Sequence, residues 1–193
     1  MKVLIAEDDD NIRNGLGEVL LGEGYEIASA RNGIEALEAF KSASPDFICL
    51  DIMMPGMDGY EVCRRIRRDD AAIPIIFISA KAEEIDRVVG LELGADDFIM
   101  KPFGVREVIA RIRAVTRRRF ASMSPERKPS SFSIQDLTVL PAELRARRGE
   151  QVIDLSLRDV KILEFLYRHR GEAVGRNAIF DACWGIDYMP DSR

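Results

Sequence analysis

The sequence has few cysteines and histidines and no long apolar run. Its three cysteines, Cys49, Cys63 and Cys183, are far apart, and His169 is the single histidine. This usage argues against a secreted disulfide framework and a clustered zinc site, so we expect free thiols. No apolar run approaches the length of a membrane span, and no long apolar signal segment follows Met1. We therefore expect a cytoplasmic protein with no membrane contact.

The composition is compatible with two modest domains. The 193 residues are 47% hydrophobic and 32% charged, which is enough apolar content for two cores. The net charge of −5 falls entirely within residues 1–119, and residues 120–193 are balanced. A unit that binds DNA normally has a basic surface, and the second part of the chain lacks that excess.

Residues 1–119 alternate between strand-like and helix-like patterns. Apolar runs of strand length lie near residues 2–6, 25–30, 46–51, 74–79 and 97–100, separated by helical stretches. Five such units predict an α/β fold with a parallel sheet covered by helices on both faces. We expect the first helix to be capped by Asp10 or Asn11 and to end near Gly22, and the last to span 104–118.

The remaining sequence predicts a linker and a smaller α+β unit. Residues 120–131 are rich in serine and proline, which is typical of a linker. From residue 132, short segments at 137–140, 143–147 and 151–155 predict a small antiparallel sheet. Two helices follow, the first capped by Ser156 and the second running from about Arg176 to Trp184.

Polar residues follow four of the apolar runs in the first domain. Glu7 and Asp8 come after the first run, and Asp51, Ser79 and Lys101 end or follow three others. The carboxyl ends of parallel strands meet at one edge of a sheet, where open α/β folds build their sites. One pocket would then hold three carboxylates, a hydroxyl and an ammonium, a combination suited to a divalent metal and a phosphoryl group.

The order and spacing of these motifs resemble a known family. Four segments resemble the receiver of a bacterial two-component response regulator: the acidic pair at 7–8 and residues 51–59, 79–81 and 94–103. Residues 155–157 and 174–185 resemble the winged-helix effector of the OmpR/PhoB subfamily. The resemblance implies a flavodoxin-like, doubly wound sheet of strand order 2-1-3-4-5 at 1–119, a linker at 120–131 and part of a winged-helix domain at 132–193.

The resemblance also implies the chemistry. Asp51 would accept a phosphoryl group from a sensor histidine kinase, with Mg²⁺ held by Asp8, Asp51, the Met53 carbonyl and, through water, Glu7. Lys101 would balance the phosphoryl charge. Such a protein is no enzyme beyond slow loss of its own phosphoryl group. Crowded carboxylates should also raise at least one pKa without metal.

A two-state switch is implied at Ser79 and Phe98, where the family more often has Thr and Tyr. We expect the phosphoryl group to draw the Ser79 hydroxyl inward and the Phe98 ring to follow. Serine keeps the hydroxyl and phenylalanine keeps the ring. The bond between Lys101 and Pro102 is a candidate cis peptide. Contacts that select the kinase are expected around Arg13, Asn14 and Phe103.

The same resemblance implies a two-fold dimer. From the residues alone, the face of the fourth helix, fifth strand and last helix reads as a solvated surface with an ion pair between Glu107 and Arg111. The subfamily dimerises through this face, pairing Arg87 with Glu107 and Asp97 with Arg111 across the axis. The expected interface comprises Arg87, Val88, Leu91, Glu92, Asp96, Asp97, Glu107, Ala110 and Arg111.

Two functions remain open at this point. The first is a phosphorylation-activated transcriptional regulator that acts on promoter DNA. The second is a signalling or phosphorelay module that acts only through protein contacts. Because the sequence ends at Arg193, where the family's recognition helix and wing would follow, we expect weak or no DNA binding by this chain. A metal-dependent phosphatase is disfavoured because Met53 stands where such enzymes have a second acid.

Overall fold

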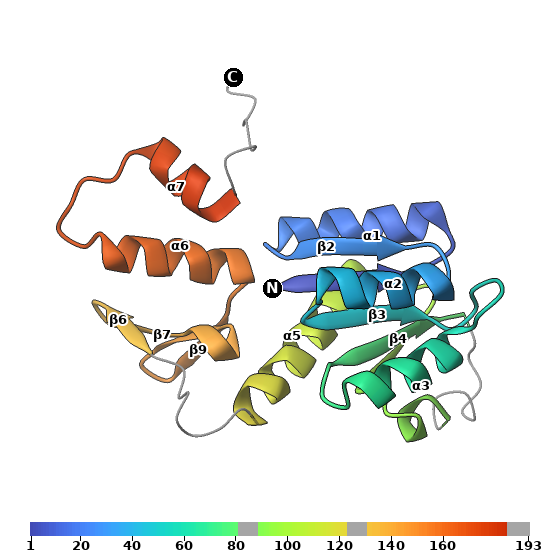
Figure 1. Cartoon of the computed structure of the whole chain (residues 1–193). Coiled ribbons are helices and arrows are strands. Elements are labelled where there is room, and N and C mark those ends of the chain that lie inside the picture. Colours follow the sequence, from blue (N-terminus) through green and yellow to red (C-terminus); the bar gives the residue numbers. More distant parts are fainter. Residues whose placement is uncertain (81–88, 123–130, 185–193) are drawn as a thin grey trace. The chain divides into compact units, whose positions relative to one another are not determined.

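The computed structural model describes residues 1–80, 89–122 and 131–184. The chain forms two compact units, Met1–Arg119 and Phe120–Arg193. Figure 1 shows a layered α/β unit and a smaller unit built from a sheet and two helices. Within the described ranges, no helix is both long and apolar enough to cross a membrane.

The first unit is a five-stranded parallel sheet with strand order β2-β1-β3-β4-β5, as predicted. Its helices cover both faces, with α2 and α3 on one side and α1 and α5 on the other (Figure 1). The strands are β1 Lys2–Ala6, β2 Glu26–Ala30, β3 Phe47–Asp51, β4 Ile75–Ser79 and β5 Asp97–Met100. The described helices with complete bounds are α1 Asp10–Gly22, α2 Gly33–Ala43, α3 Gly59–Asp69 and α5 Val105–Ser122.

The central strands explain why the first unit has this architecture. Every residue of β3 and β4 is buried, as expected for parallel strands covered on both faces. Side chains alternate between the two faces, and Leu4, Ile48 and Phe77 join one core cluster with α2 and α3. The last residue of each of these two strands, Asp51 or Ser79, is therefore buried at the carboxyl edge.

Two helix boundaries differ from the sequence prediction. The cap of α1 is Asp9, not Asp10 or Asn11, because the Asp9 carboxylate accepts hydrogen bonds from the Asn11 and Ile12 amides. Helix α5 continues to Ser122, beyond the predicted end at 118 and into the segment expected to be linker. Arginine and alanine favour helices, and the first proline of that segment comes only at residue 125. Residues 123–130 of the expected linker lie outside the described ranges.

The second unit contains an antiparallel sheet of order β6-β7-β8-β9 followed by two helices, the arrangement of a winged-helix domain. It has one strand more than predicted, because the short segment β6 pairs with β7. The elements are β6 Phe132–Ile134, β7 Leu137–Leu140, β8 Arg145–Arg148, β9 Gln151–Asp154, α6 Leu157–Arg168 and α7 Arg176–Trp184. Ser156 caps α6 as predicted, in a reciprocal capping box with Asp159.

Rare residues in the sequence mostly have packing roles. Cys49, Cys63 and Cys183 are buried free thiols, as expected. The His169 ring lies 4.3 Å from the Phe165 ring, and its Nδ1 contacts the Phe165 carbonyl at 2.9 Å. The Trp184 ring lies 5.0 Å from the ring of Phe180, on the same helix.

Candidate functional site

The predicted polar residues meet at the carboxyl edge of the parallel sheet. Glu7 and Asp8 follow β1, Asp51 ends β3, Ser79 ends β4 and Lys101 follows β5. Glu7, Asp51 and Ser79 are at most 3% exposed, whereas Asp8 is exposed to solvent. The topology therefore brings together residues that are up to 94 positions apart in the chain.

Lys101 is the hub of this cluster. Its Nζ donates hydrogen bonds to a Glu7 carboxylate oxygen at 2.7 Å and to Asp51 Oδ2 at 2.8 Å. The Lys101 amide bonds the Ser79 carbonyl at 2.8 Å, which ties β5 to the end of β4. The peptide bond to Pro102 is cis, as the sequence analysis anticipated. One ammonium thus contacts two of the three carboxylates.

The three acids are close enough to share a cation. One carboxylate oxygen from each of Glu7, Asp8 and Asp51 lies within 4.8 Å of the others. Hard divalent cations such as Mg²⁺ take oxygen ligands of this kind. The donor set is therefore compatible with a metal site that also admits solvent at Asp8.

The charged form of Glu7 is disfavoured in this cluster even with Lys101 beside it. Burial raises the pKa of Glu7 from 4.5 to about 7, and the negative charge of Asp51 adds to the rise. A raised pKa was predicted from crowding, but desolvation is the larger cause. For Lys101, burial opposes the charged form, yet the hydrogen bonds to Asp51 and Glu7 outweigh it and raise the pKa.

The loop after Asp51 is held against the site by a close approach of backbone. The Met53 amide donates to Asp51 Oδ1 at 3.1 Å, and the Gly59 amide donates to the Ile52 carbonyl at 3.0 Å. A Cβ at Gly59 would lie 2.2 Å from the Asp51 carbonyl oxygen, so only glycine fits there. The loop that carries Met53 therefore stays folded over Asp51.

The two residues expected to switch are both buried. Ser79 is fully buried, and Phe98 is 6% exposed with its ring centroid 6.5 Å from that of Phe77. The Phe98 ring thus already lies in the core in this structure.

The expected dimer face is divided between outward and inward residues. Leu91, Glu92, Glu107 and Ala110 are exposed, and so is Met100, which the sequence analysis did not include. Arg111 contacts Asp97 at 3.0 Å and Glu107 at 2.9 Å within the chain. The pair of Asp97 with Arg111, expected across a dimer axis, is therefore intramolecular here. Arg87 and Val88 lie outside the described residues.

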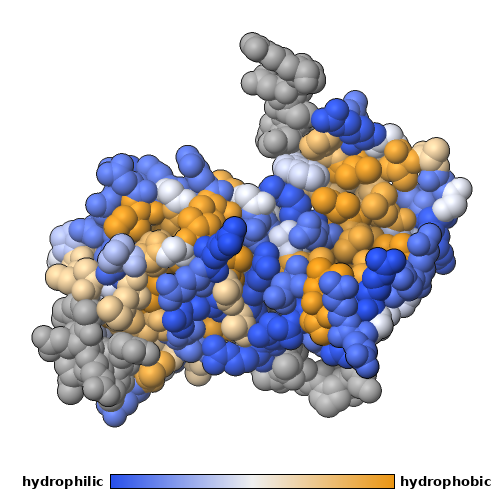
Figure 2. Space-filling view, turned by 180° about the vertical axis from the view of Figure 1, so that it is seen from behind, coloured by the Kyte–Doolittle hydropathy of each residue, from blue (hydrophilic) through white to orange (hydrophobic). Residues whose placement is uncertain are grey.

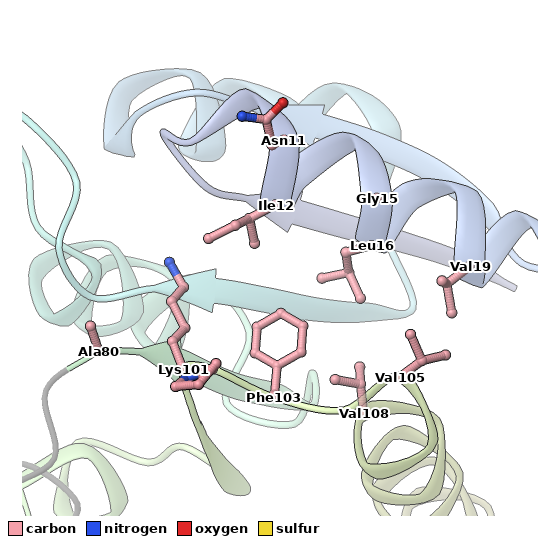
Figure 3. A pocket seen from close by; sticks show the side chains of 11 residues that line it. Asn11, Ile12, Gly15, Leu16, Val19, Ala80, Lys101, Phe103, Val105 and Val108 are labelled. Atoms are coloured by element: carbon pink, nitrogen blue, oxygen red, sulfur yellow. The ribbon is translucent and has the colours of Figure 1, made fainter.

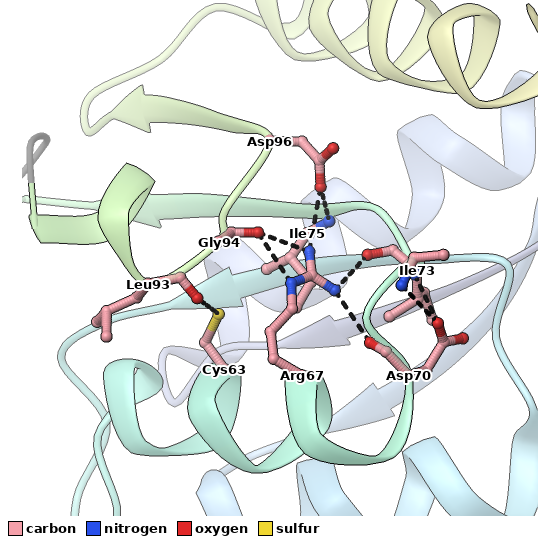
Figure 4. Close-up of polar contacts among 9 residues, drawn as sticks. Cys63, Arg67, Asp70, Ile73, Ile75, Leu93, Gly94 and Asp96 are labelled. Atoms are coloured by element: carbon pink, nitrogen blue, oxygen red, sulfur yellow. Dashed lines mark hydrogen bonds and ion pairs between the residues drawn. The ribbon is translucent and has the colours of Figure 1, made fainter. Parts of the chain in front are cut away.

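Asp96 turns away from that face toward Arg67, a residue that the sequence analysis missed. Figure 4 shows the Arg67 guanidinium among the Gly94, Asp70 and Ile73 carbonyls and the Asp96 carboxylate. The Asp96 carboxylate also accepts from the Ile75 amide at 2.9 Å. The Asp96 carboxylate is therefore engaged by Arg67 and by the Ile75 amide within the first unit.

An apolar pocket of about 510 Å³ lies beside Lys101, between α1 and the start of α5. In Figure 3 Ile12, Leu16 and Val19 of α1 face Phe103, Val105 and Val108 across it. Of the residues expected to select a kinase, Phe103 lines this pocket and Asn14 is exposed. Arg13 is only 5% exposed, so its predicted place on the kinase-facing surface is wrong: its guanidinium bonds the loop after β1.

The second unit exposes apolar side chains. Figure 2, which views the molecule from behind Figure 1, shows a hydrophobic area on this unit bordered by hydrophilic residues. Leu166 is 39% exposed and Val152 is 54% exposed, while Ile162 and Ile179 are half-buried. On the two helices of this unit, Leu166 is therefore more exposed than Ile162 and Ile179.

Comparison with known families covers both units. Residues 3–113 match the family described as "Response regulator receiver domain". Residues 149–193 match "Transcriptional regulatory protein, C terminal". The two matches fall on the α/β unit and on the second unit, in the order that the sequence motifs predicted.

Similar proteins span both matches. The alkaline phosphatase synthesis transcriptional regulatory protein SphR of Synechococcus elongatus is 38% identical over all of this chain and 77% of its own length. PhoP of Bacillus subtilis, which carries the same description, is 39% identical over all of this chain and 82% of its length. The Francisella response regulator 1452 receiver domain superposes with a TM-score of 0.58 at 32% identity, covering 61% of this chain and 97% of that structure.

Proposed function

The chain belongs to the two-component transcriptional response regulators of the OmpR/PhoB type, and from this premise we propose that phosphorylation of Asp51 is its switch. The observation that carries the proposal is the contact of Lys101 with both Glu7 and Asp51 beside a third carboxylate. Three acids and one ammonium meet where the strands end, and a phosphoryl group needs both a nucleophile and positive charge.

Each residue at the carboxyl edge has a distinct role in this proposal. The Asp51 carboxylate attacks the phosphorus of a phosphohistidine on a sensor kinase. The new O–P bond gives an acyl phosphate as the P–N bond breaks, and the kinase histidine leaves as an imidazole that takes up a proton from solvent. Asp8 and Asp51 would bind Mg²⁺ directly, with Glu7 acting through water and Met53 through its carbonyl. The cation, when bound, supplies positive charge that offsets the repulsion between the carboxylates and the phosphoryl oxygens. Apart from slow loss of the phosphoryl group, no catalysis is proposed.

Lys101 and Ser79 then complete the charge balance. Lys101 already pairs with Asp51, so a short movement of its ammonium brings it onto the transferred oxygens. The Ser79 hydroxyl would donate a hydrogen bond to the same group, because Ser79 ends the neighbouring strand. Drawing Ser79 inward would leave space beside β4, and the Phe98 ring, which already lies in the core, would rotate within the core to fill it. This movement connects Asp51 to the face that includes β5.

The proposed output is a homodimer through the fourth helix, β5 and α5. Exposed Leu91, Met100 and Ala110 provide an apolar centre with charged residues around it. Arg111 would exchange its intramolecular partner Asp97 for the same residue of a second copy. Arg87→Glu should then abolish phosphorylation-dependent dimers in sedimentation, whereas dimers as stable as those of the wild type would refute the interface.

The proposed partners are a sensor histidine kinase and promoter DNA. The pocket between α1 and α5 lies beside Lys101, so a kinase that docks there presents its phosphohistidine near Asp51. The second unit would contact DNA when dimerisation places two copies on it. A protein-contact module without DNA binding is the second candidate, which the balanced charge of residues 120–193 favours.

The test is intact mass after incubation with acetyl phosphate, on wild type and Asp51→Ala, with Mg²⁺ or with EDTA. We expect one added phosphoryl group in the wild type with Mg²⁺ and none in the other three samples. An equally phosphorylated Asp51→Ala would refute the assignment of the acceptor. Binding of promoter fragments by the phosphorylated protein would favour the transcriptional output over the protein-contact module.

A further inference from the structure

Arg13 is a buried cation that contacts the backbone of the acidic loop. Its Nη1 donates to the Glu7 carbonyl at 2.8 Å and lies 3.5 Å from the Asp8 carbonyl. Its Nη2 contacts the carboxylate of Asp10. Side chains on a helix lean toward its amino terminus, so an arginine in the first turns of α1 naturally reaches back to this loop.

The loop that Arg13 contacts contains two of the three acids. Only Glu7, Asp8 and Asp9 separate the end of β1 from the start of α1. At one end, the Glu7 amide bonds the Ala30 carbonyl at 3.0 Å; at the other, the Asp9 carboxylate caps the helix. Arg13 holds the carbonyls between these anchors, and the direction of each peptide determines where the neighbouring carboxylate points.

We propose that Arg13 is a positioning residue for the cation site, acting on Glu7 and Asp8 through their backbone. This inference rests on the proposed function, in which these acids bind Mg²⁺. Residues that orient metal ligands typically contribute 10- to 100-fold to metal affinity. Arginine suits the task because its planar group offers several donors in a fixed geometry.

The charge of Arg13 works in the opposite direction but is largely neutralised. A cation near a metal site repels the metal, so removal of Arg13 would tighten binding if charge dominated. The donors of Arg13 face two carbonyls and the carboxylate of Asp10. The Asp10 side chain is 70% exposed to solvent. The positional effect should therefore exceed the effect of charge.

Calorimetric Mg²⁺ titration of the full chain tests the proposal, using wild type, Arg13→Met, Arg13→Lys and Arg113→Met. We expect Mg²⁺ to bind Arg13→Met about 10- to 100-fold more weakly than wild type, with Arg13→Lys in between. Arg113 is the matched control, because its guanidinium is partly buried and also paired with a carboxylate, that of Glu23, which directly follows α1. Arg113→Met should lose stability but keep the wild-type Mg²⁺ affinity.

Hydrogen exchange without metal gives a second readout. The amides of Asp8 and Asp9 should exchange faster in Arg13→Lys than in wild type or Arg113→Met, and this comparison decides the question if Arg13→Met does not fold. Equal or tighter Mg²⁺ binding by the Arg13 variants, beside a wild type that binds, would overturn the role of Arg13 alone. A wild type that binds no Mg²⁺ would overturn the proposed function as well.

Discussion

The two ends of the parallel sheet each hold a partly buried cation, but in opposite electrostatic settings. At the carboxyl end, Lys101 lies between the buried carboxylates of Glu7 and Asp51. At the amino end of β4 and β5, Arg67 is surrounded by backbone carbonyls and the half-exposed Asp96. The first end buries two carboxylates, and burial together with the negative charge of Asp51 raises the pKa of Glu7. The second end satisfies its cation mainly with neutral backbone carbonyls, besides the one carboxylate of Asp96.

This difference indicates that the carboxyl end of the sheet has a functional role and the amino end a structural one. A cluster with excess buried negative charge gains from binding a cation, so it can respond to metal and phosphoryl groups. A cation bound to fixed carbonyls gains little from any ligand and serves to hold α3 against the turn before β5. Four predictions test the contrast, from the largest expected effect to the smallest.

Lys101→Met should have the largest effect on stability. Removing the ammonium leaves Glu7 and Asp51 buried without their partner, which typically costs about 3–5 kcal/mol. Urea unfolding in EDTA at pH 8, followed by circular dichroism, should show the loss, and at pH 5 the loss should shrink because Glu7 protonates. Fluorescence of Trp184 reports on the second unit and provides the internal control. A loss independent of pH would contradict the electrostatic cause.

Arg67→Met should destabilise the first unit by roughly 2–3 kcal/mol, because the Gly94, Asp70 and Ile73 carbonyls together lose a charged donor. Unlike the Lys101 variant, it should show the same loss at pH 5 and pH 8 and with or without Mg²⁺. Urea unfolding under the four conditions provides the measurement. If Mg²⁺ recovered the lost stability, the two ends of the sheet would be coupled, and the contrast between them would be refuted.

Glu7→Gln should stabilise the metal-free protein at high pH. The pKa of Glu7 is raised in the fold, so the folded state holds a proton that the unfolded state releases, and wild-type stability falls as pH rises from 4.5 to about 7. The variant lacks this loss, and we expect a gain on the order of 2 kcal/mol at pH 8 that disappears below pH 4.5. If the unfolding free energies of the two proteins changed with pH in the same way, the raised pKa of Glu7 would be ruled out.

Arg111→Ala should have the smallest effect on the monomer. Its ion pairs with Asp97 and Glu107 are partly exposed, and such pairs contribute about 0–1 kcal/mol. If Arg111 serves the proposed dimer, sedimentation of the phosphorylated variant should show weakened association despite near-normal stability. If the phosphorylated variant dimerised as strongly as the wild type, Arg111 would have no role in the dimer beyond its intramolecular contacts.

The sequence predicted the fold and the acid cluster because apolar runs of strand length place their following polar residues at one known edge. Asp51, Glu7 and Lys101 meet there regardless of side-chain detail. The roles of Arg13, Arg67 and Asp96 could not be predicted. The sequence gives the charge of each side chain, but not the backbone groups or charged partners that the side chain contacts in the fold. The cap at Asp9 was missed because four consecutive acidic residues, Glu7 to Asp10, offered several candidates.

The most direct measurement is the effect of Mg²⁺ on the unfolding free energy of the wild-type protein at pH 8. If the carboxyl end of the sheet is a cation site, saturation at about 100 times the dissociation constant should stabilise the first unit by about 2.7 kcal/mol. The transition reported by Trp184 in the second unit should change less, and Asp51→Ala should lose most of the gain. No stabilisation of the wild type at millimolar Mg²⁺ would contradict the account, since Lys101 alone would then satisfy the acids.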